Sequence, residues 1–245
     1  MSDVLRDARK LKNQARRRRE AQRYEEAADL LKEATDLLEP TLIDLKSDDP
    51  SLFETDVARE LSDCYGSLGG VLRSAGHFED SVKAYESGYG LEKDKRYGMI
   101  NSYNLVQRLV ARMLLKPELI GSAEWVVKDI EDVEDLDMWK ALDDAASVIQ
   151  EQRSVRATDP WFLADRALVF LLLGRPEEEE AWQEFRQAPS FAYAITSTLR
   201  VINDLLASMG EVKNSGSVGP RSEEVYRRLA RAQALLENLQ SLQQA

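Results

Sequence analysis

The chain has 245 residues, enough for one or two domains or for one helical repeat array. Its formal net charge of −11 disfavours nucleic acid and acidic membranes as default partners, because both would repel it. A single cysteine and a single histidine exclude a disulfide framework, a cysteine-based zinc site and a multi-histidine metal site, so we expect no metal and no cofactor.

Residues 3–21 predict a basic helix that carries the run Arg16, Arg17, Arg18 and Arg19. This basic patch could bind nucleic acid or an acidic protein surface, or it could be a solvated face balanced by nearby glutamates. No aromatic side chains are interleaved with the arginines to stack on bases, so nucleic acid is disfavoured. The same segment has no apolar signal region, and no apolar run approaches the roughly 18 residues of a membrane span. We therefore expect a cytoplasmic protein without a membrane partner.

Helical spacing of apolar residues predicts the remaining elements. In chain order they cover residues 24–45, 54–74, 78–93, a long apolar helix over 95–115, 123–133, 137–153, 160–173, 177–188, 189–209 and 222–243. No stretch alternates with a period of two for long enough to predict a sheet. The predicted fold class is all-α, an α-solenoid of antiparallel helix pairs. We expect a repeat domain over 1–209, a Gly- and Ser-rich flexible linker over 210–221, and a capping or partner-docking helix within 222–245.

Small residues interrupt the two helices predicted around residue 76. Glycine inside a helix costs roughly 0.5–1 kcal/mol relative to alanine, so these positions need a packing reason. We expect Gly69, Ser81 and Gly88 to lie where helices cross closely. The pattern is Tyr65-x2-Leu68-Gly69-x2-Leu72 followed by Ser81-x3-Tyr85 and Gly88. It resembles the tetratricopeptide repeat (TPR), whose pattern is W-x2-L-G-x2-Y followed by A-x3-F.

The same spacing recurs in two further places, with departures from a regular period of 34 residues. The matching positions are Ala15, Tyr24, Ala27, Leu31 and Ala34, and then Ala167, Gly174, Ala181, Phe185 and Ala188. Three segments are also similar to the TPR-like domain beside the kinase in ASK-family MAP kinase kinase kinases and in related bacterial signalling and defence proteins. They read RYGMINSYNLVQRL, DPWFLADRALVFLLLGRPEEEEAWQEFRQA and STLRVINDLL. The resemblance implies a regulatory, protein-binding scaffold.

A polar stripe on the predicted helix 95–115 is the candidate partner-binding site. Asn101, Asn104, Arg108 and Arg112 recur at spacings of three and four, which places them on one helix face. In TPR proteins the first helix of each pair lines the concave surface, where Asn can bond extended backbone and Arg can hold a carboxylate. Asp165, Arg200 and Asn203 could extend this groove from later helices. The alternative is a buried polar network that fixes helix register.

The last predicted helix carries an apolar seam with heptad-like spacing. Its members are Val225, Leu229, Ala232, Leu236 and Leu239. The seam could cap the last repeat, or it could dock onto a partner or a second copy of the chain.

Sequence motifs of catalysis are missing: there is no G-x-S-x-G, no Walker A and no H-E-x-x-H. We therefore expect no enzyme activity and no catalytic residue. The predicted function is a protein-binding scaffold or adaptor of a regulatory or defence assembly. The alternative is a nucleic-acid-associated regulatory subunit that uses the N-terminal basic helix.

Overall fold

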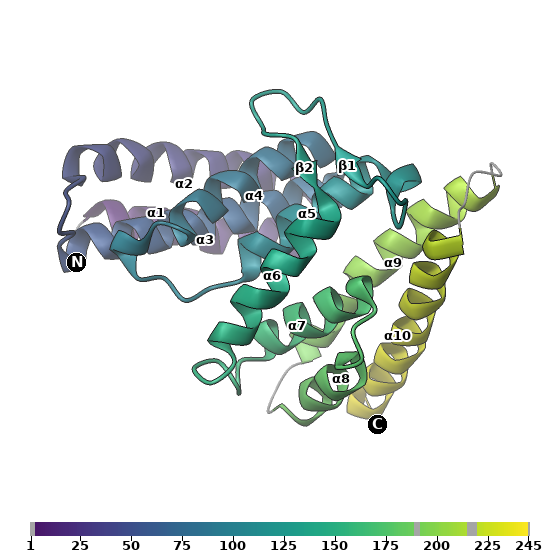
Figure 1. The fold of residues 1–245 in the computed structure, drawn as a ribbon. Helices are drawn as coiled ribbons and strands as arrows, with labels where there is room; N and C mark the ends of the chain where they lie inside the picture. Colours follow the sequence, from purple (N-terminus) through teal and green to yellow (C-terminus); the bar gives the residue numbers. More distant parts are fainter. Residues whose placement is uncertain (1–2, 189–191, 215–219, 245) are drawn as a thin grey trace. The chain divides into compact units, whose positions relative to one another are not determined.

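The structure, a computed structural model, describes residues 3–188, 192–214 and 220–244. Within these residues the chain is all-α, with ten α-helices and two short 3-10 helices (Figure 1). The strands described are two residues long each, β1 (Val126–Val127) and β2 (Leu136–Asp137), paired antiparallel. In the part of the chain that the structure describes, no helix is long and apolar enough to cross a membrane. The chain divides into two compact units, Met1–Ala111 and Arg112–Ala245, so the predicted domain over 1–209 spans both.

The first unit is built from helices, and each of the first four, α1 to α4, packs against the next of these along the chain (Figure 1). They are α1 (Asp3–Glu20), α2 (Tyr24–Leu45), α3 (Leu52–Ala75), α4 (Phe78–Glu92), the 3-10 helix η1 (Lys95–Tyr97) and the start of α5 (Tyr103–Leu115). Gly76 ends α3 with φ +86°, a left-handed conformation that glycine adopts without a Cβ clash. The turn therefore brings α4 directly back onto α3.

The close approach that the small residues predict is present between α3 and α4. A Cβ on Gly69 would lie 2.8 Å from ring atoms of Tyr85, well inside van der Waals contact. Ser81 is fully buried, and its hydroxyl donates a hydrogen bond to the Gly69 carbonyl at 2.8 Å. The two helices therefore pack through a glycine, a serine and one tyrosine ring.

The segment predicted as one helix over 95–115 is instead broken. Gly98 ends η1 with φ +55°, and regular α-helix begins again only at Tyr103. A left-handed residue cannot continue an α-helix, which is why the apolar periodicity misplaces the start.

The second unit contains the last turn of α5 and the remaining elements. These are the 3-10 helix η2 (Pro117–Leu119), β1, β2, α6 (Met138–Gln152), α7 (Pro160–Leu173), α8 (Glu178–Gln187), α9 (Ala192–Asn214) and α10 (Pro220–Gln244). The helix predicted over 123–133 is wrong, because this segment forms β1 and turns. Asp129 and Asp132 adopt φ near +60°, a conformation that aspartate tolerates and that a helix excludes.

The C-terminal part of the second unit pairs α9 with α10. Residues 210–214 are helical, although they belong to the segment predicted as a flexible linker, and the predicted helix start at 189 lies outside the described residues. Hydrogen bonds from Gln240 to Thr196 and from Gln233 to Asn203 show that the two helices run antiparallel. Four members of the apolar seam are buried: Val225, Leu229, Ala232 and Leu236. They are covered within this unit, as an end cap requires.

Candidate functional site

The predicted polar stripe begins before α5 rather than on it. Asn101 precedes the helix, and its side-chain Oδ1 accepts a hydrogen bond from the Tyr103 backbone N–H at 3.1 Å. This interaction satisfies a donor of the first turn of α5. The amide Nδ2 of Asn101 donates to Oε1 of Glu92 at 2.7 Å. Asn101 thus joins the start of α5 to the end of α4.

Asn104 occupies a slot between two helices that only glycine can leave open. A Cβ on Gly66 of α3 would lie 2.8 Å from its Oδ1, and a Cβ on Gly88 of α4 would lie 2.5 Å from its Nδ2. Asn104 is 1% exposed, and Nδ2 donates to Glu92 Oε1 at 2.8 Å and to the Ser62 carbonyl at 3.3 Å. Because Gly88 has no side chain, the polar side chain of Asn104 from α5 fits beside it.

Ser62, Glu92, Asn101 and Asn104 form one set of hydrogen bonds, called here the Glu92 cluster. Ser62 Oγ also donates to Glu92 Oε1, at 3.3 Å, so this oxygen accepts three hydrogen bonds. Burial raises the pKa of Glu92 to about 7, and the hydrogen bonds from Asn104 and Ser62 only partly oppose this increase. The carboxyl group is therefore poised to change protonation near neutral pH.

The two arginines of the stripe also have partners within the chain. The Arg108 guanidinium bonds Glu86 at 3.0 Å and lies 4.0 Å from the ring centroid of Tyr89, a cation–π distance. Arg112 belongs to the second unit, is 1% exposed, and donates to the Glu134 carbonyl at 3.2 Å. The burial of Asn104 and Arg112 is compatible with the alternative interpretation of the stripe, a buried polar network that fixes helix register.

The candidates from later helices differ in exposure. Asp165 lies on α7 and is 4% exposed, so little of it is available to a partner. Arg200 and Asn203 are exposed on α9, and Asn203 Oδ1 accepts a hydrogen bond from Gln233 of α10 at 3.0 Å. Arg200 and Asn203 are therefore the predicted site residues on α9 whose side chains reach the surface.

The basic patch on α1 is partly neutralised by its own surroundings. Arg16 pairs with Glu20 at 3.2 Å, and Arg18 pairs with Glu26 at 3.5 Å. A shallow hollow of about 430 Å³ runs along this helix, and Arg17 is the residue of the predicted run that lines it. Its other lining residues are Arg6, Arg9, Lys10, Asn13 and Gln14.

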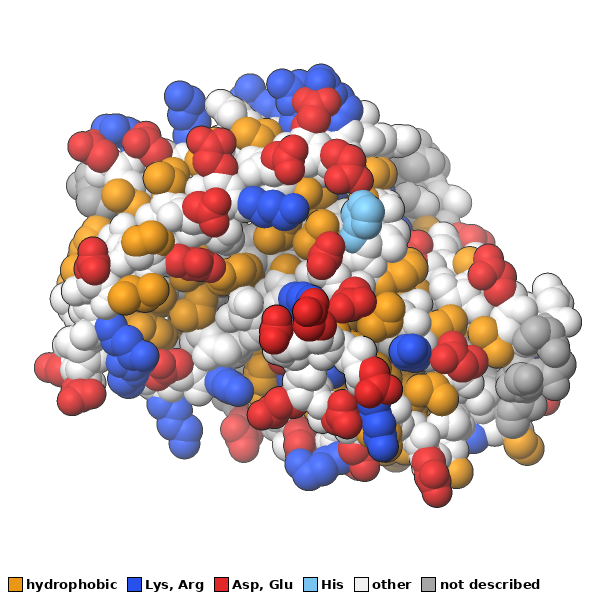
Figure 2. All heavy atoms as spheres, turned by 90° about the horizontal axis from the view of Figure 1, so that it is seen from above, with side chains coloured by type: hydrophobic (Ala, Val, Ile, Leu, Met, Phe, Trp, Pro, Cys, Tyr) orange, Lys and Arg blue, Asp and Glu red, His pale blue; other side chains and the backbone are white. Residues whose placement is uncertain are grey.

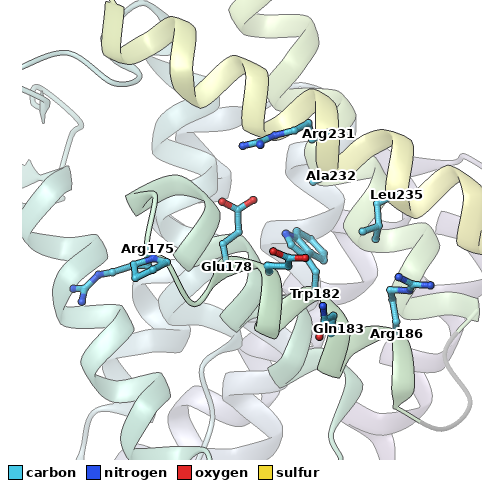
Figure 3. Close-up of a pocket in the computed structure, with 10 residues that line it drawn as sticks. Arg175, Glu178, Trp182, Gln183, Arg186, Arg231, Ala232 and Leu235 are labelled. Carbon is cyan, nitrogen blue, oxygen red and sulfur yellow. The ribbon is translucent and has the colours of Figure 1, made fainter.

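A groove between α8 and α10 is a concave feature that the sequence did not indicate (Figure 3). Its volume is about 340 Å³, within the range of about 300–1,000 Å³ typical of ligand pockets. Glu178, Trp182 and Arg186 follow one another at i, i+4 and i+8 along one wall, on α8. Arg231 and Leu235 line the facing wall, on α10. The i, i+4 spacing on both helices was a usable signal, but only the fold brings these two helix faces together.

The charges of this groove are unevenly satisfied. Arg175 at one end pairs with Asp143 at 2.6 Å. Arg186 and Arg231 are exposed, and among the described residues neither makes a salt bridge. The pKa of Glu178 is raised because burial disfavours its charged form, and the positive charges of Arg231 and Arg228 only partly oppose this. The exposed Glu179 also lines the groove, so Arg186 and Arg231 stand beside two glutamates and an apolar floor.

The other side of α8 is fixed by a network of ion pairs. Arg166 of α7 is 1% exposed and bonds both Glu180, at 3.2 Å, and Glu184. Arg153, which follows the last residue of α6, contacts the same two carboxylates, at 3.0 and 2.5 Å. Because these contacts anchor α8 to α6 and α7, the wall of the groove is in place before any ligand arrives.

Reactive side chains are dispersed in the part of the chain that the structure describes. The His77 ring contacts Glu25 at 2.9 Å at the α3–α4 turn, and Figure 2 shows the histidine (pale blue) at the surface. Cys64 is buried, and burial raises the pKa of its thiol to about 12. Within the described residues, no three metal-ligating side chains come together.

Comparisons with family models, curated proteins and solved structures gave no match to this chain.

Proposed function

We propose that this chain is a non-catalytic protein-binding scaffold, made of degenerate TPR-like helix pairs and working in a cytosolic regulatory or defence assembly. The close helix contact at Gly69, Ser81 and Tyr85 supports the repeat interpretation, because these are the positions that the TPR pattern assigns to tight packing. Antiparallel packing of α9 on α10 is compatible with the same architecture.

The observation that carries the proposal is the α8–α10 groove. Arginine and tryptophan are the side chains most often responsible for binding energy at protein interfaces, and the groove presents both. Its walls are held by contacts on the other side of α8, so binding does not need to order them first. A guanidinium holds anions and an indole holds apolar groups, and both are binding functions rather than proton-transfer functions at neutral pH.

This proposal moves the partner site away from the predicted stripe. The side chains of Asn101, Asn104 and Arg108 are committed to contacts with Glu92 and Glu86 in the free chain. A partner would have to break those contacts before it could use them. The groove arginines require no such exchange.

Affinity capture from an extract of the native host tests the proposal. The bait would be the wild-type chain, the double variant Arg186→Glu/Arg231→Glu, and Arg200→Glu as a matched charge reversal outside the groove. We expect one or more proteins, identified by mass spectrometry, to be retained by wild type and Arg200→Glu and lost with the double variant. Identical sets of retained proteins for all three baits would contradict a partner site in the groove.

A second candidate function is nucleic-acid association through α1. The observation that favours it is the hollow along this helix, which includes the exposed side chains of Lys10 and Arg17. Phosphate contacts of this kind make affinity fall steeply with salt. Fluorescence anisotropy with labelled RNA and DNA at 50 and 200 mM salt tests this alternative. Salt-sensitive binding that Lys10→Glu/Arg17→Glu abolishes would favour it over the scaffold.

A further inference from the structure

One glycine of α3 lies beside polar atoms from three other helices of the first unit. A Cβ on Gly70 would lie 3.4 Å from the Tyr85 hydroxyl of α4, and 3.6 Å from both Arg19 Nη1 of α1 and the Tyr103 hydroxyl of α5. These are ordinary van der Waals distances, so alanine would fit here, although glycine is disfavoured inside a helix. Gly70 therefore leaves open a space bounded by three hydrogen-bond donors, called here the Gly70 site.

Two arginines at this site lack a carboxylate partner. Arg73, one turn after Gly70, is 5% exposed; its Nη1 donates to Gln107 Oε1 at 2.5 Å. In the part of the chain that the structure describes, its Nε has no hydrogen-bond partner, and neither Arg73 nor the half-buried Arg19 makes a salt bridge. An unpaired charge is costly to bury, and two guanidinium groups repel each other. A bound anion would offset both costs.

The Tyr85 hydroxyl connects the two arginines to the same space. It is fully buried and has no hydrogen-bond partner among the described residues. Burial raises the pKa of Tyr85, and the neighbouring Tyr103 adds to the increase. The positive charges of Arg73 and Arg19 oppose it. Both guanidinium groups are thus close enough to the hydroxyl for their charges to act on it.

Acidic side chains on the adjoining surface contact other groups. Glu25 and Glu26 line a hollow that also includes Ser74 of α3. Glu26 pairs with Arg18 at 3.5 Å, and Glu25 contacts the His77 ring at 2.9 Å. Neither carboxylate forms a salt bridge with the two arginines of the Gly70 site in the described part of the chain. These acids therefore do not neutralise the site by direct contact.

From this arrangement we infer that the Gly70 site binds a phosphate group. The half-buried Arg19 and Tyr103 would donate at its open side, the buried Tyr85 hydroxyl would donate from below, and Arg73 would add positive charge. The donors come from three helices, so they suit the several oxygens of a phosphate better than the two coplanar oxygens of a carboxylate. This inference does not depend on the scaffold function, because the proposed groove is in the other unit.

Isothermal titration calorimetry at constant ionic strength tests the ligand. We expect saturable binding of inorganic phosphate, and at least tenfold weaker binding of acetate. Glycerol phosphate separates two sources of the same chemistry. If it binds as well as inorganic phosphate, the site accepts phosphate groups carried by larger molecules; if only inorganic phosphate binds, the site takes the free ion. Equal binding of acetate, or no saturable binding of either phosphate up to 10 mM, would overturn the inference.

Protein variants locate the binding. Gly70→Ala places a methyl group in the space at van der Waals distances, so it should fold and still weaken phosphate binding at least tenfold. Arg19→Gln, at a half-buried position, should weaken binding to a similar extent. Arg59→Gln, which removes an exposed arginine elsewhere on α3, should change the affinity less than twofold.

Thermal unfolding provides a second measurement and checks that each variant is folded. A ligand that binds the native state raises the melting temperature, so phosphate should stabilise wild type and Arg59→Gln but not Gly70→Ala. Wild-type affinity for phosphate in a folded Gly70→Ala or Arg19→Gln protein would contradict binding at the Gly70 site.

Discussion

The Glu92 cluster in the first unit and the α8–α10 groove in the second differ in whether their polar side chains have partners within the chain. Asn104 fills a slot beside two glycines and bonds Glu92 and Ser62. Arg186 and Arg231 stand at a rim and make no salt bridge among the described residues. A polar stripe on a helix therefore identifies a binding surface only after its internal partners have been excluded.

The largest expected effect concerns the pH dependence of the cluster. The pKa of Glu92 rises from an ordinary 4.5 to about 7 on folding, which corresponds to about 3 kcal/mol of stability. The folded state holds this proton more tightly than the unfolded chain does. The contribution is therefore fully present below pH 4.5 and is lost as the pH rises through about 7.

Urea unfolding of wild type and Glu92→Gln between pH 4.5 and 8 measures this contribution. Glutamine cannot ionise, so the difference in unfolding free energy between the two proteins should change across this range, with wild type losing more stability as the pH rises. Parallel pH profiles would mean that Glu92 ionises as an exposed glutamate does. The Glu92 cluster would then not differ from the groove in the burial of its charged group.

Alanine substitutions of one buried and one exposed asparagine compare the stability that each side chain contributes. Asn104→Ala removes donors to the buried Glu92 carboxyl and the Ser62 carbonyl, so it should cost about 1–3 kcal/mol. Asn203→Ala, at an exposed position on α9, should stay within about 0.5 kcal/mol of wild type. Thermal and urea unfolding report both values. A neutral Asn104→Ala would return Asn104 to the list of candidate binding residues.

A pair of glycines tests the packing beside the cluster. Gly69→Ala places a Cβ 2.8 Å from the Tyr85 ring and should destabilise the protein by about 1 kcal/mol or more. An added Cβ on Gly90, also in α4, meets nothing within 4 Å, so Gly90→Ala should stabilise the helix by up to about 1 kcal/mol. Equal melting temperatures of these two variants would show that Gly69 is not at a close helix contact.

The smallest expected effect on stability is in the groove. Because Arg186 and Arg231 are exposed and without a salt bridge among the described residues, replacing either with glutamine should change the unfolding free energy by less than about 0.5 kcal/mol. Differential scanning fluorimetry of Arg186→Gln and Arg231→Gln checks this expectation. A large loss of stability would mean that the two arginines stabilise the fold through contacts within the chain, as the Glu92 cluster does.

Sequence alone determined the helical class and most helix ranges. Apolar spacing predicts α2 and α7 over the ranges that the structure has, and the small residues predict the close contact of Gly69 with the following helix. These features follow from local propensity and periodicity, which act within a few turns of chain. The two wrong helix predictions contain residues with a positive φ, which interrupts an α-helix. Gly98 breaks the predicted helix over 95–115, and Asp129 and Asp132 interrupt the predicted helix over 123–133.

Whether each polar side chain is buried or exposed was decided only by tertiary structure. Asn104 and Asn203 are the same residue type on apolar helices, but Gly66 and Gly88 enclose the first, while the second stays exposed beside Gln233. Likewise, the i, i+4 spacing of Trp182 and Arg186 is ordinary until α10 brings Arg231 and Leu235 opposite them. Burial and hydrogen-bond partners depend on which helices meet, and that is a long-range property that periodicity along one helix does not contain.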